Sequence, residues 1–456
     1  MPHKTLFTFF LAIGLLPLIT NAQSKRVMSI DDLITTIRVS DPQLSHDGKR
    51  VLFTRTTTAL DSGKRNSDIW VVPSDGSAPP RQLITGDRTE STPRLTPDGK
   101  RIVFISNRDG ALQVYVSDSE AHDAKQLTKL SGGVQGPLVV SPDGKKVAFV
   151  SDAYPHCKDE ECNKRTRELA EKDPVKVRVL TSLPYRHWDE WRTNLRHHIF
   201  ITDIETGETR DITPGDFDSP PHFDEDGAIT FSPDSRLFAF VSNRDGKDKE
   251  MMNTNHDVWL VPVTGGEVKK ITTNPASDHE PVFSPDGKLL AIKSQRRPGF
   301  ESDRWYLDLY DQTSGAKRTV FDTPDLSIEE FTFSMDGHTI FFTAIDKGLV
   351  NLYSVPAAGG APKLVAKGGT ISQIHAGPDF VVYSKSTLTT PPELFRVSSD
   401  GSGAKQLTNE NAHLLNQIQE PKYESLTVSG AGGAPIQYWL LKPPNFDASK
   451  NIRQCS

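Results

Sequence analysis

The chain has 456 residues, a quarter of them charged, and a mean hydropathy of −0.46, so its body should be soluble and globular. Its 32 glycines and 32 prolines favour many turns over long helices. The formal net charge is −6 and the basic residues are spread along the sequence, which argues against the concentrated basic face of a nucleic-acid-binding protein.

The N-terminal residues 1–22 are typical of a signal peptide. Lys4 precedes an apolar stretch from Leu6 to Ile19, and the small residue Ala22 follows at a suitable cleavage point. The stretch is short for a bilayer-spanning helix, although an uncleaved N-terminal anchor is the alternative. No other segment is apolar enough to cross a membrane. We therefore expect a periplasmic or secreted protein with no membrane span after signal cleavage.

A turn of the Ser-Pro-Asp-Gly kind recurs along the chain, followed each time by a short apolar strand. In such a turn proline presets φ at the first corner, aspartate accepts backbone hydrogen bonds, and glycine tolerates the exit geometry. Full copies begin at Ser141 and Ser284, and variants begin at Thr96 and Ser232. The turn aspartates, looser copies included, stand at positions 47, 98, 143, 234, 286, 336 and 379.

Further elements follow each turn in a fixed order. A Ser-Asn-Arg-Asp-Gly hairpin loop occurs at 106–110 and 242–246, a third strand such as Asp68–Val72 comes next, and a short fourth strand such as Lys125–Thr128 ends the unit. Each unit thus predicts four antiparallel strands. Successive turn aspartates are 43 to 52 residues apart, except for one step of 91. Four-stranded units with a period of roughly 40 to 50 residues are typical of propeller blades.

The predicted fold is all-β, a seven-bladed β-propeller over residues 23–415 built from four-stranded antiparallel blades. Blades stacked around a channel bury both faces of each sheet, which a single blade cannot do. The long step is one blade plus an insertion of roughly 40 residues, which we place at about 153–196 in blade three. A pair of open β-sandwiches is the alternative, and the regular period disfavours it.

Two cysteines lie five residues apart in a polar part of the insertion, Cys157 and Cys162. In an oxidising compartment such a pair more often closes a small loop than binds a metal, so we expect a disulfide. A zinc site would need two more ligands; His156 is adjacent, but no second Cys or His pair follows. We therefore expect no metal and no cofactor.

The repeats and two further segments resemble the prolyl oligopeptidase family. The Ser-Pro-Asp-Gly-Lys blades look like those of TolB-type and prolyl-oligopeptidase-type propellers. Segments 185–192 (Tyr-Arg-His-Trp-Asp-Glu-Trp-Arg) and 197–201 resemble exported dipeptidyl-peptidase V-like (acylaminoacyl-peptidase-like) members, and 420–446 looks like the first strands of their α/β-hydrolase domain. The resemblance implies a serine peptidase that cleaves short peptides at a Ser-Asp-His triad, with the propeller restricting access.

The sequence departs from that family after Phe446. The G-x-S-x-G nucleophile turn needs glycine two residues before and two residues after the serine, and no serine of this chain has both. We therefore expect residues 416–456 to be the start of a truncated α/β-hydrolase domain, with no catalytic residues in the chain and no hydrolysis by it. A frameshift or premature stop is the simplest account.

The candidate substrate-binding residues are Trp188, Asp189, Glu190, Trp191 and Arg192, all within the insertion. Aromatic walls hold apolar side chains of a peptide, and a carboxylate can pair with its α-ammonium group. The alternative is that the tryptophans plug the blade and the charges are solvated. The partner implied is a short peptide with a free N-terminus and no nucleic acid, while a homo-oligomer is left open.

Two functions compete at this point. The first is the substrate-gating propeller portion of an exported serine peptidase of the dipeptidyl aminopeptidase type, inactive in the chain as given. The second is a stand-alone TolB-like periplasmic propeller that binds protein partners. The tail distinguishes them, because a binding module has no reason to carry hydrolase strands with an apolar residue such as Trp439.

Overall fold

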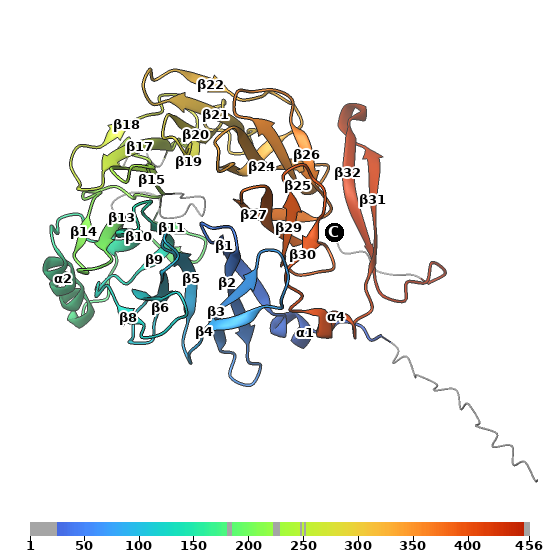
Figure 1. Ribbon diagram of the computed structural model, residues 1–456, viewed down its shortest axis with the longest axis horizontal. Coiled ribbons are helices and arrows are strands. Elements are labelled where there is room, and N and C mark those ends of the chain that lie inside the picture. Colours follow the sequence, from blue (N-terminus) through green and yellow to red (C-terminus); the bar gives the residue numbers. More distant parts are fainter. Residues whose placement is uncertain (1–24, 180–184, 222–228, 247–248, 250–251, 451–456) are drawn as a thin grey trace, which may run out of the picture.

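The computed structural model describes residues 25–179, 185–221, 229–246, 249 and 252–450, so the expected signal peptide and Cys455 lie outside the described residues. The chain forms a ring of four-stranded antiparallel blades around a central axis (Figure 1). Seven such blades follow one another in chain order, which confirms the predicted all-β propeller. A single parallel bridge between Val350 and Thr370 joins blades 6 and 7 into one continuous sheet.

The first three blades are built from residues 38–211. Blade 1 comprises β1 (Arg38–Leu44), β2 (Arg50–Thr58), β3 (Arg65–Pro73) and β4 (Arg81–Ile84). Blade 2 comprises β5 (Glu90–Leu95), β6 (Arg101–Ser106), β7 (Gln113–Asp118) and β8 (Lys125–Gln126). Blade 3 comprises β9 (Gln135–Val140), β10 (Lys146–Ala153), β13 (Arg196–Asp203) and β14 (Thr209–Asp211). The insertion therefore leaves blade 3 between its second and third strands.

The remaining four blades complete the ring. Blade 4 comprises β15 (Thr230–Phe231), β16 (Leu237–Ser242), β17 (Asp257–Pro262) and β18 (Lys269–Lys270). Blade 5 comprises β19 (Asp278–Phe283), β20 (Leu289–Ser294), β21 (Tyr306–Asp311) and β22 (Lys317–Thr319). Blade 6 comprises β23 (Ser327–Phe333), β24 (Thr339–Asp346), β25 (Leu349–Pro356) and β26 (Lys363–Ala366). Blade 7 comprises β27 (Thr370–Ala376), β28 (Phe380–Ser386), β29 (Glu393–Ser398) and β30 (Lys405–Gln406).

The Ser-Pro-Asp-Gly turns connect the first and second strands of the blades through one hydrogen-bonding scheme. In blade 3 the Ser141 hydroxyl donates to Asp143 Oδ1 at 2.6 Å, and the Lys145 N–H donates to the same oxygen at 3.0 Å. The Lys146 N–H then donates to Ser141 Oγ at 2.9 Å, while Gly144 adopts a φ of 70°. The serine, aspartate and glycine that define the repeat in the sequence are thus the residues whose hydrogen bonds and backbone conformation form the turn.

The same turns also pack blade against blade. A Cβ built on Gly337 would lie 3.3 Å from Pro285 of the preceding blade, and one on Gly48 would lie 3.0 Å from Pro378 of blade 7. Two features favour glycine at these positions: its backbone φ is positive, and the neighbouring proline ring leaves little room for a Cβ atom. Blade 4 departs from the pattern: Ser235 takes a φ of 60° in place of glycine, and its hydroxyl accepts the N–H of Asp143.

Apolar residues form seven buried clusters, one between each pair of neighbouring blades. The cluster between blades 1 and 7 joins the two ends of the ring, with Val51 and Phe53 packed against Val382 and Leu394. Each cluster is shared by two sheets. An isolated blade would therefore expose the apolar residues that it contributes to the clusters on both of its faces.

Blades 1 and 7 meet without exchanging strands, since blade 1 is built entirely from residues 38–84 and blade 7 from residues 370–406. At this seam the buried Asn411 side chain forms hydrogen bonds with the backbone of Ile37, as a neighbouring strand would. Its Oδ1 accepts the Ile37 N–H, and its Nδ2 donates to the Ile37 carbonyl, both at 2.9 Å. Arg55 and Glu410 add an ion pair of 2.7 Å. Blades 1 and 7 are therefore joined at the seam by side chains and the apolar cluster, with no strand shared between them.

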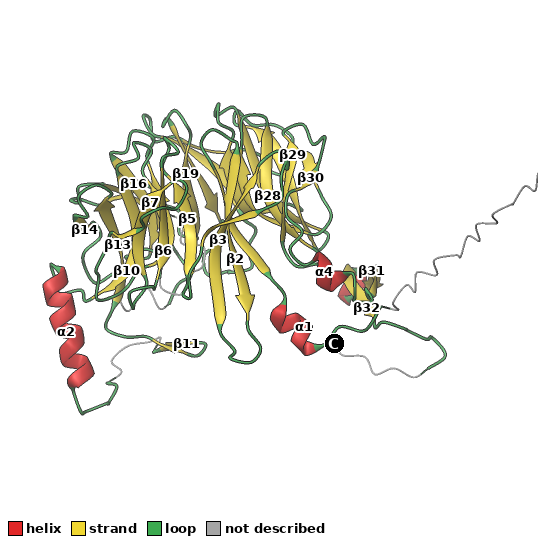
Figure 2. Cartoon of the chain, turned by 60° about the horizontal axis from the view of Figure 1, so that its bottom comes forward, coloured by secondary structure: helices red, strands yellow, loops and turns green. Residues whose placement is uncertain are grey.

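Short elements outside the blades gather on one side of the ring (Figure 2). They are α1 (Ile30–Thr35), α2 (Glu160–Lys172), the paired strands β11 (Arg186–His187) and β12 (Glu190–Trp191), α4 (Ala412–Leu415), and a terminal hairpin of β31 (Lys422–Ser429) and β32 (Pro435–Lys442) with the 3₁₀ turn Ala431–Gly433 between its strands. The insertion and the terminal hairpin thus project from the same side.

Candidate functional site

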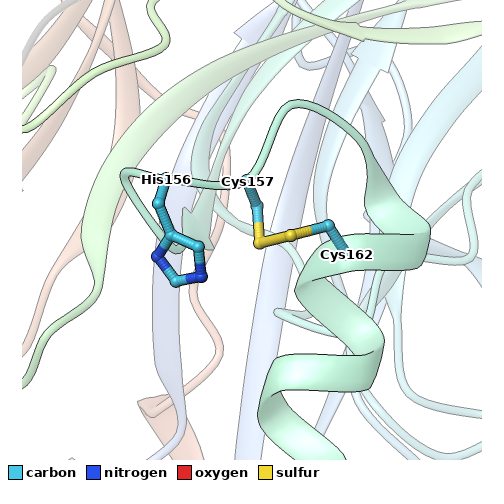
Figure 3. Close-up of side chains that lie close together, drawn as sticks. All are labelled: His156, Cys157 and Cys162. Carbon is cyan, nitrogen blue, oxygen red and sulfur yellow. A yellow bond between two sulfur atoms is a disulfide. The ribbon is translucent and has the colours of Figure 1, made fainter.

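The insertion begins with a capped and cross-linked helix. The Asp159 side chain caps α2 by accepting the Cys162 N–H at 2.8 Å. Cys157 and Cys162 are joined by a disulfide whose sulfur atoms are 2.03 Å apart, with the His156 ring nearby (Figure 3). Because both sulfurs are bonded to each other, neither is a thiolate that could ligate a metal beside His156.

Strands β11 and β12 form a small arm, in which Arg186 pairs with Trp191 and His187 pairs with Glu190. Trp188 lies at the turn of the arm with a φ of 47° and is 82% exposed. This exposure rules out a role for Trp188 as a plug of the blade. Asp189 beside it is also exposed, while the side chains of His187 and Glu190 lie outside the described part of the chain.

Trp191 is held between two neighbours at the base of the arm. Its ring stacks on Tyr185 with centroids 6.2 Å apart, and the Arg178 guanidinium lies 4.7 Å from the ring centroid. Trp191 is still 40% exposed. Since Arg178 comes from the segment after α2, the cation–π contact ties that segment to the arm.

Two arginines follow the arm and are anchored by aspartates. Arg192 places Nη2 3.4 Å from Asp218 Oδ2, and its side chain is 17% exposed. Asp218 also accepts the His197 N–H at 2.9 Å, so the carboxylate positions both the arm and the start of β13. Arg196 makes a 2.8 Å contact to Asp216, and its side chain is 8% exposed.

The histidines at the start of β13 have structural partners. His198 is fully buried, with Nδ1 2.7 Å from Asp211 and Nε2 2.9 Å from the Gly215 carbonyl oxygen. His197 Nε2 lies 3.4 Å from Asp152. These contacts connect β13 to β14 and to the loop after β14, on which Asp216 and Asp218 lie.

A cavity of about 720 Å³ lies between α2, residues 177–179 and residues 192–196. Of the five residues predicted to bind substrate, Arg192 lines this cavity, whereas Trp188, Asp189 and Trp191 are not among the described lining residues, and the Glu190 side chain lies outside the described part of the chain. The cavity wall also contains Arg178, Arg196 and Asp216, which the sequence did not single out. No local motif marks these three residues, because they converge only when the insertion folds back on blade 3.

A second, more apolar cavity of about 470 Å³ lies at the seam side of the ring, between the residues around Val27, the loop at Leu388 and the chain after α4. The Arg26 N–H donates to the Gln417 carbonyl and the Gln419 N–H to the Arg26 carbonyl, at 2.9 and 2.7 Å. The N-terminal segment and the link to the terminal hairpin are therefore paired beside this cavity.

One hydrogen-bonded serine–histidine pair invites comparison with a catalytic site. Ser277 Oγ lies 2.7 Å from His279 Nε2, but both residues are buried, and the same nitrogen is 3.1 Å from His256 Nδ1. The His279 ring also packs edge-on against Trp305. The pair sits at the start of β19, away from any strand-to-helix turn that would present a nucleophile, so it fits a packing role.

Within the described ranges, no helix is long and apolar enough to cross a bilayer.

The chain matches no protein-family model. It is 30% identical to dipeptidyl-peptidase 5 of Porphyromonas endodontalis over 436 residues, and 29% identical to that of Porphyromonas gingivalis over 426 residues. These alignments cover 93% and 91% of this chain and 61% of each relative, so the chain spans about three-fifths of the length of the relatives it matches.

Solved structures agree on the fold. Acylaminoacyl peptidase of Pyrococcus horikoshii superimposes with a TM-score of 0.69 and 18% identity, covering 90% of this chain and 58% of that one. The β-propeller domain of the trilobed protease of Pyrococcus furiosus, described as having an open velcro topology, gives a TM-score of 0.56 at 20% identity over 82% of this chain and 96% of its own. The chain is therefore similar to the dipeptidyl-peptidase 5 proteins over most of its own length, and its described residues share a β-propeller fold with these solved structures.

Proposed function

We propose that this chain is the substrate-gating propeller portion of an exported serine peptidase of the dipeptidyl aminopeptidase type, and that it catalyses no hydrolysis itself. The observation that carries the proposal is positional. The arm, on which Trp188 and Asp189 are exposed, and the terminal hairpin project from one side of the ring (Figure 2). The cavity lies within the same insertion as the arm. A peptide held there would lie between the propeller and anything packed on the hairpin.

The hairpin favours this proposal over a stand-alone TolB-like binding module. It stands off the ring, with Gln437 donating to the Lys347 carbonyl at 2.8 Å, and apolar residues such as Ile436, Tyr438 and Leu441 are exposed on it. Ile436 and Tyr438 lie on one face of β32 and Leu441 on the other, and a hairpin with exposed apolar side chains on both faces is expected where its strands join a larger sheet. The disulfide supports export, because such bonds persist in oxidising compartments.

The exposed Asp189 carboxylate at the arm suits a peptide's free N-terminus, since an α-ammonium group pairs with carboxylate through charge-assisted hydrogen bonds. The purified chain should bind the tripeptide Ala-Ala-Phe at least about tenfold more tightly than its N-acetylated form, as measured by calorimetry. Asp189→Asn combined with Glu190→Gln should abolish the difference. Glu161→Gln, an exposed change on α2, is the matched control and should keep it.

Catalytic inertness is tested on the same preparation. The chain should release no product from dipeptide-linked chromogenic substrates and should resist labelling by a fluorophosphonate probe, because acyl transfer needs an activated serine, a base and oxyanion donors in one place. Stoichiometric labelling of a serine would overturn the proposed inertness. Equal binding of the free and acetylated peptides would overturn the proposed recognition of the N-terminus.

A further inference from the structure

The cavity between α2 and β13 carries an excess of positive charge. Among the described residues, its lining includes Arg178, Arg192 and Arg196 against one acidic residue, Asp216. A guanidinium group presents planar, paired donors that match a carboxylate. Three of them around one cavity are therefore a specific chemical feature of the insertion.

The three arginines differ in how far the protein already neutralises them. Arg196 is paired with Asp216 at 2.8 Å, and Arg192 lies 3.4 Å from Asp218, which is not among the described lining residues. Arg178 is exposed, and among the described residues its guanidinium contacts the Trp191 ring rather than a carboxylate. Of the three arginines, Arg178 is therefore the most available to bind an anionic ligand.

A second observation comes from the buried wall. The Arg196 side chain is 8% exposed, and its Nε has no hydrogen-bond partner among the described residues, although Nη1 donates to the Leu195 carbonyl at 2.8 Å. A buried donor without a partner costs free energy that a bound acceptor can recover. The wall therefore holds one unsatisfied donor beside an exposed cation.

The rest of the cavity suits the apolar part of a peptide. Val177 and Val179 are largely exposed, and Tyr154 and Leu195 complete the lining with them. A cavity of about 720 Å³ falls within the size range of small-molecule sites, roughly 300–1,000 Å³. Apolar walls around a few convergent cations are the usual arrangement for an amphipathic ligand with one acidic end.

We infer that this cavity is a carboxylate-binding subsite, in which Arg178, Arg192 and Arg196 hold the acidic group of a short peptide. The inference rests on the proposed peptide-binding function and adds a second recognition point to the arm. A chain that grips an α-ammonium group at the arm and a carboxylate in the cavity selects peptides by length, because both charged ends must be within reach.

The test compares Ala-Ala-Phe carrying a free C-terminal carboxylate with its C-terminal amide on the purified chain. Calorimetry should give a dissociation constant about tenfold lower for the free acid, with the difference shrinking as salt rises. Ala-Asp-Phe-amide and Ala-Asn-Phe-amide form a second arm, which distinguishes an acidic side chain from a C-terminal carboxylate as the source of the anion.

Arg178→Gln should remove the preference for the free acid, and Arg178→Lys should retain part of it. Arg165→Gln, an exposed change on α2 outside the cavity lining, is the matched control and should keep the preference. Equal binding of acid and amide, or an unchanged preference in Arg178→Gln, would overturn the subsite while leaving recognition of the N-terminus standing. Failure of every peptide to bind would overturn both.

Discussion

The aspartate of each Ser-Pro-Asp-Gly turn accepts two hydrogen bonds at once. In blade 5 the Ser284 hydroxyl and the Lys288 N–H both donate to Asp286, at 2.7 and 3.1 Å. These donors hold the pKa of the Asp286 carboxyl down at about 2, with the hydroxyl making the larger contribution. All the groups involved lie within five residues of sequence, which is why this part of the structure could be predicted from the sequence.

Replacing Asp286 tests the turn. Asp286→Ala removes both acceptor contacts, and we expect it to lower the free energy of unfolding by about 1 kcal/mol. Urea denaturation at pH 7 measures the change. Asp325→Ala, at an exposed aspartate outside the turns, is the control and should leave the midpoint unchanged. An equal loss in both variants would show that the effect is general surface charge.

Glu330 on β23 is the second informative side chain. Burial raises its pKa to about 8, with help from the nearby Glu280 carboxylate, while the Ile374 and Gln373 N–H groups and Lys293 oppose the shift. The folded state therefore holds a proton that the unfolded state releases near pH 4.5. Stability from this group is complete below about pH 4.5 and is lost as pH rises through 8.

Glu330→Gln keeps the neutral form at every pH. We expect the variant to be more stable than the parent by on the order of 1 kcal/mol at pH 8 to 9, and close to it at pH 5. Thermal unfolding across that pH range measures the difference. Glu267→Gln, on an exposed loop, should follow the parent throughout. A constant offset between variant and parent at all pH values would contradict a titrating Glu330.

At the scale of elements, the insertion was only partly predictable from the sequence. The cysteine spacing predicted a small loop, and the structure joins Cys157 and Cys162 at the start of α2. The aromatic run at 188–191 marked the arm, but its residues could not be assigned to a wall or to solvent without the fold. Arg178 and Arg196 lie 18 positions apart in no recognisable motif, so their shared cavity was not predictable.

Thiol counting tests the disulfide. Exported protein that is unfolded without reductant should titrate one thiol per chain, because two of the three cysteines are bonded. The closed loop spans only five positions of sequence, so Cys157→Ser with Cys162→Ser should cost about 2 kcal/mol or less. Three titrating thiols would contradict the bond in the native protein.

The terminal hairpin is the least integrated element. Tyr423, Val428 and Phe446 are exposed in addition to the apolar side chains of β32. Removing residues 422–456 should raise soluble yield and reduce aggregation measured by light scattering, because exposed apolar strands promote association. The cut leaves the Arg26–Gln417 pairing intact. A lower soluble yield would show that the hairpin stabilises the ring.

At the scale of the whole molecule, the number of blades follows from the spacing of one turn, but the closure of the ring does not. Each blade's own four strands can be found in contiguous sequence, and the seven apolar clusters repeat that local pattern. The seam joins residues more than 350 positions apart, such as Ile37 and Asn411. No periodicity in the sequence shows which polar side chain will bridge the two ends.

The seam should be the weakest joint of the ring, because blades 1 and 7 are the neighbouring pair that does not follow one another directly along the chain. Asn411→Ala removes two hydrogen bonds to the Ile37 backbone, in a buried setting where each contributes about 1 kcal/mol. We expect a loss of about 2 kcal/mol and faster amide hydrogen exchange in β1 and in β27 to β29, with exchange in β16 and β17 unchanged. Asn274→Ala, which removes a hydrogen bond to the Ala276 carbonyl between blades 4 and 5, is the control and should leave exchange at the seam unaltered. A uniform rise over all seven blades in Asn411→Ala would instead show that the ring opens as one cooperative unit, and that the apolar cluster shared by blades 1 and 7 makes the seam as strong as any other blade contact.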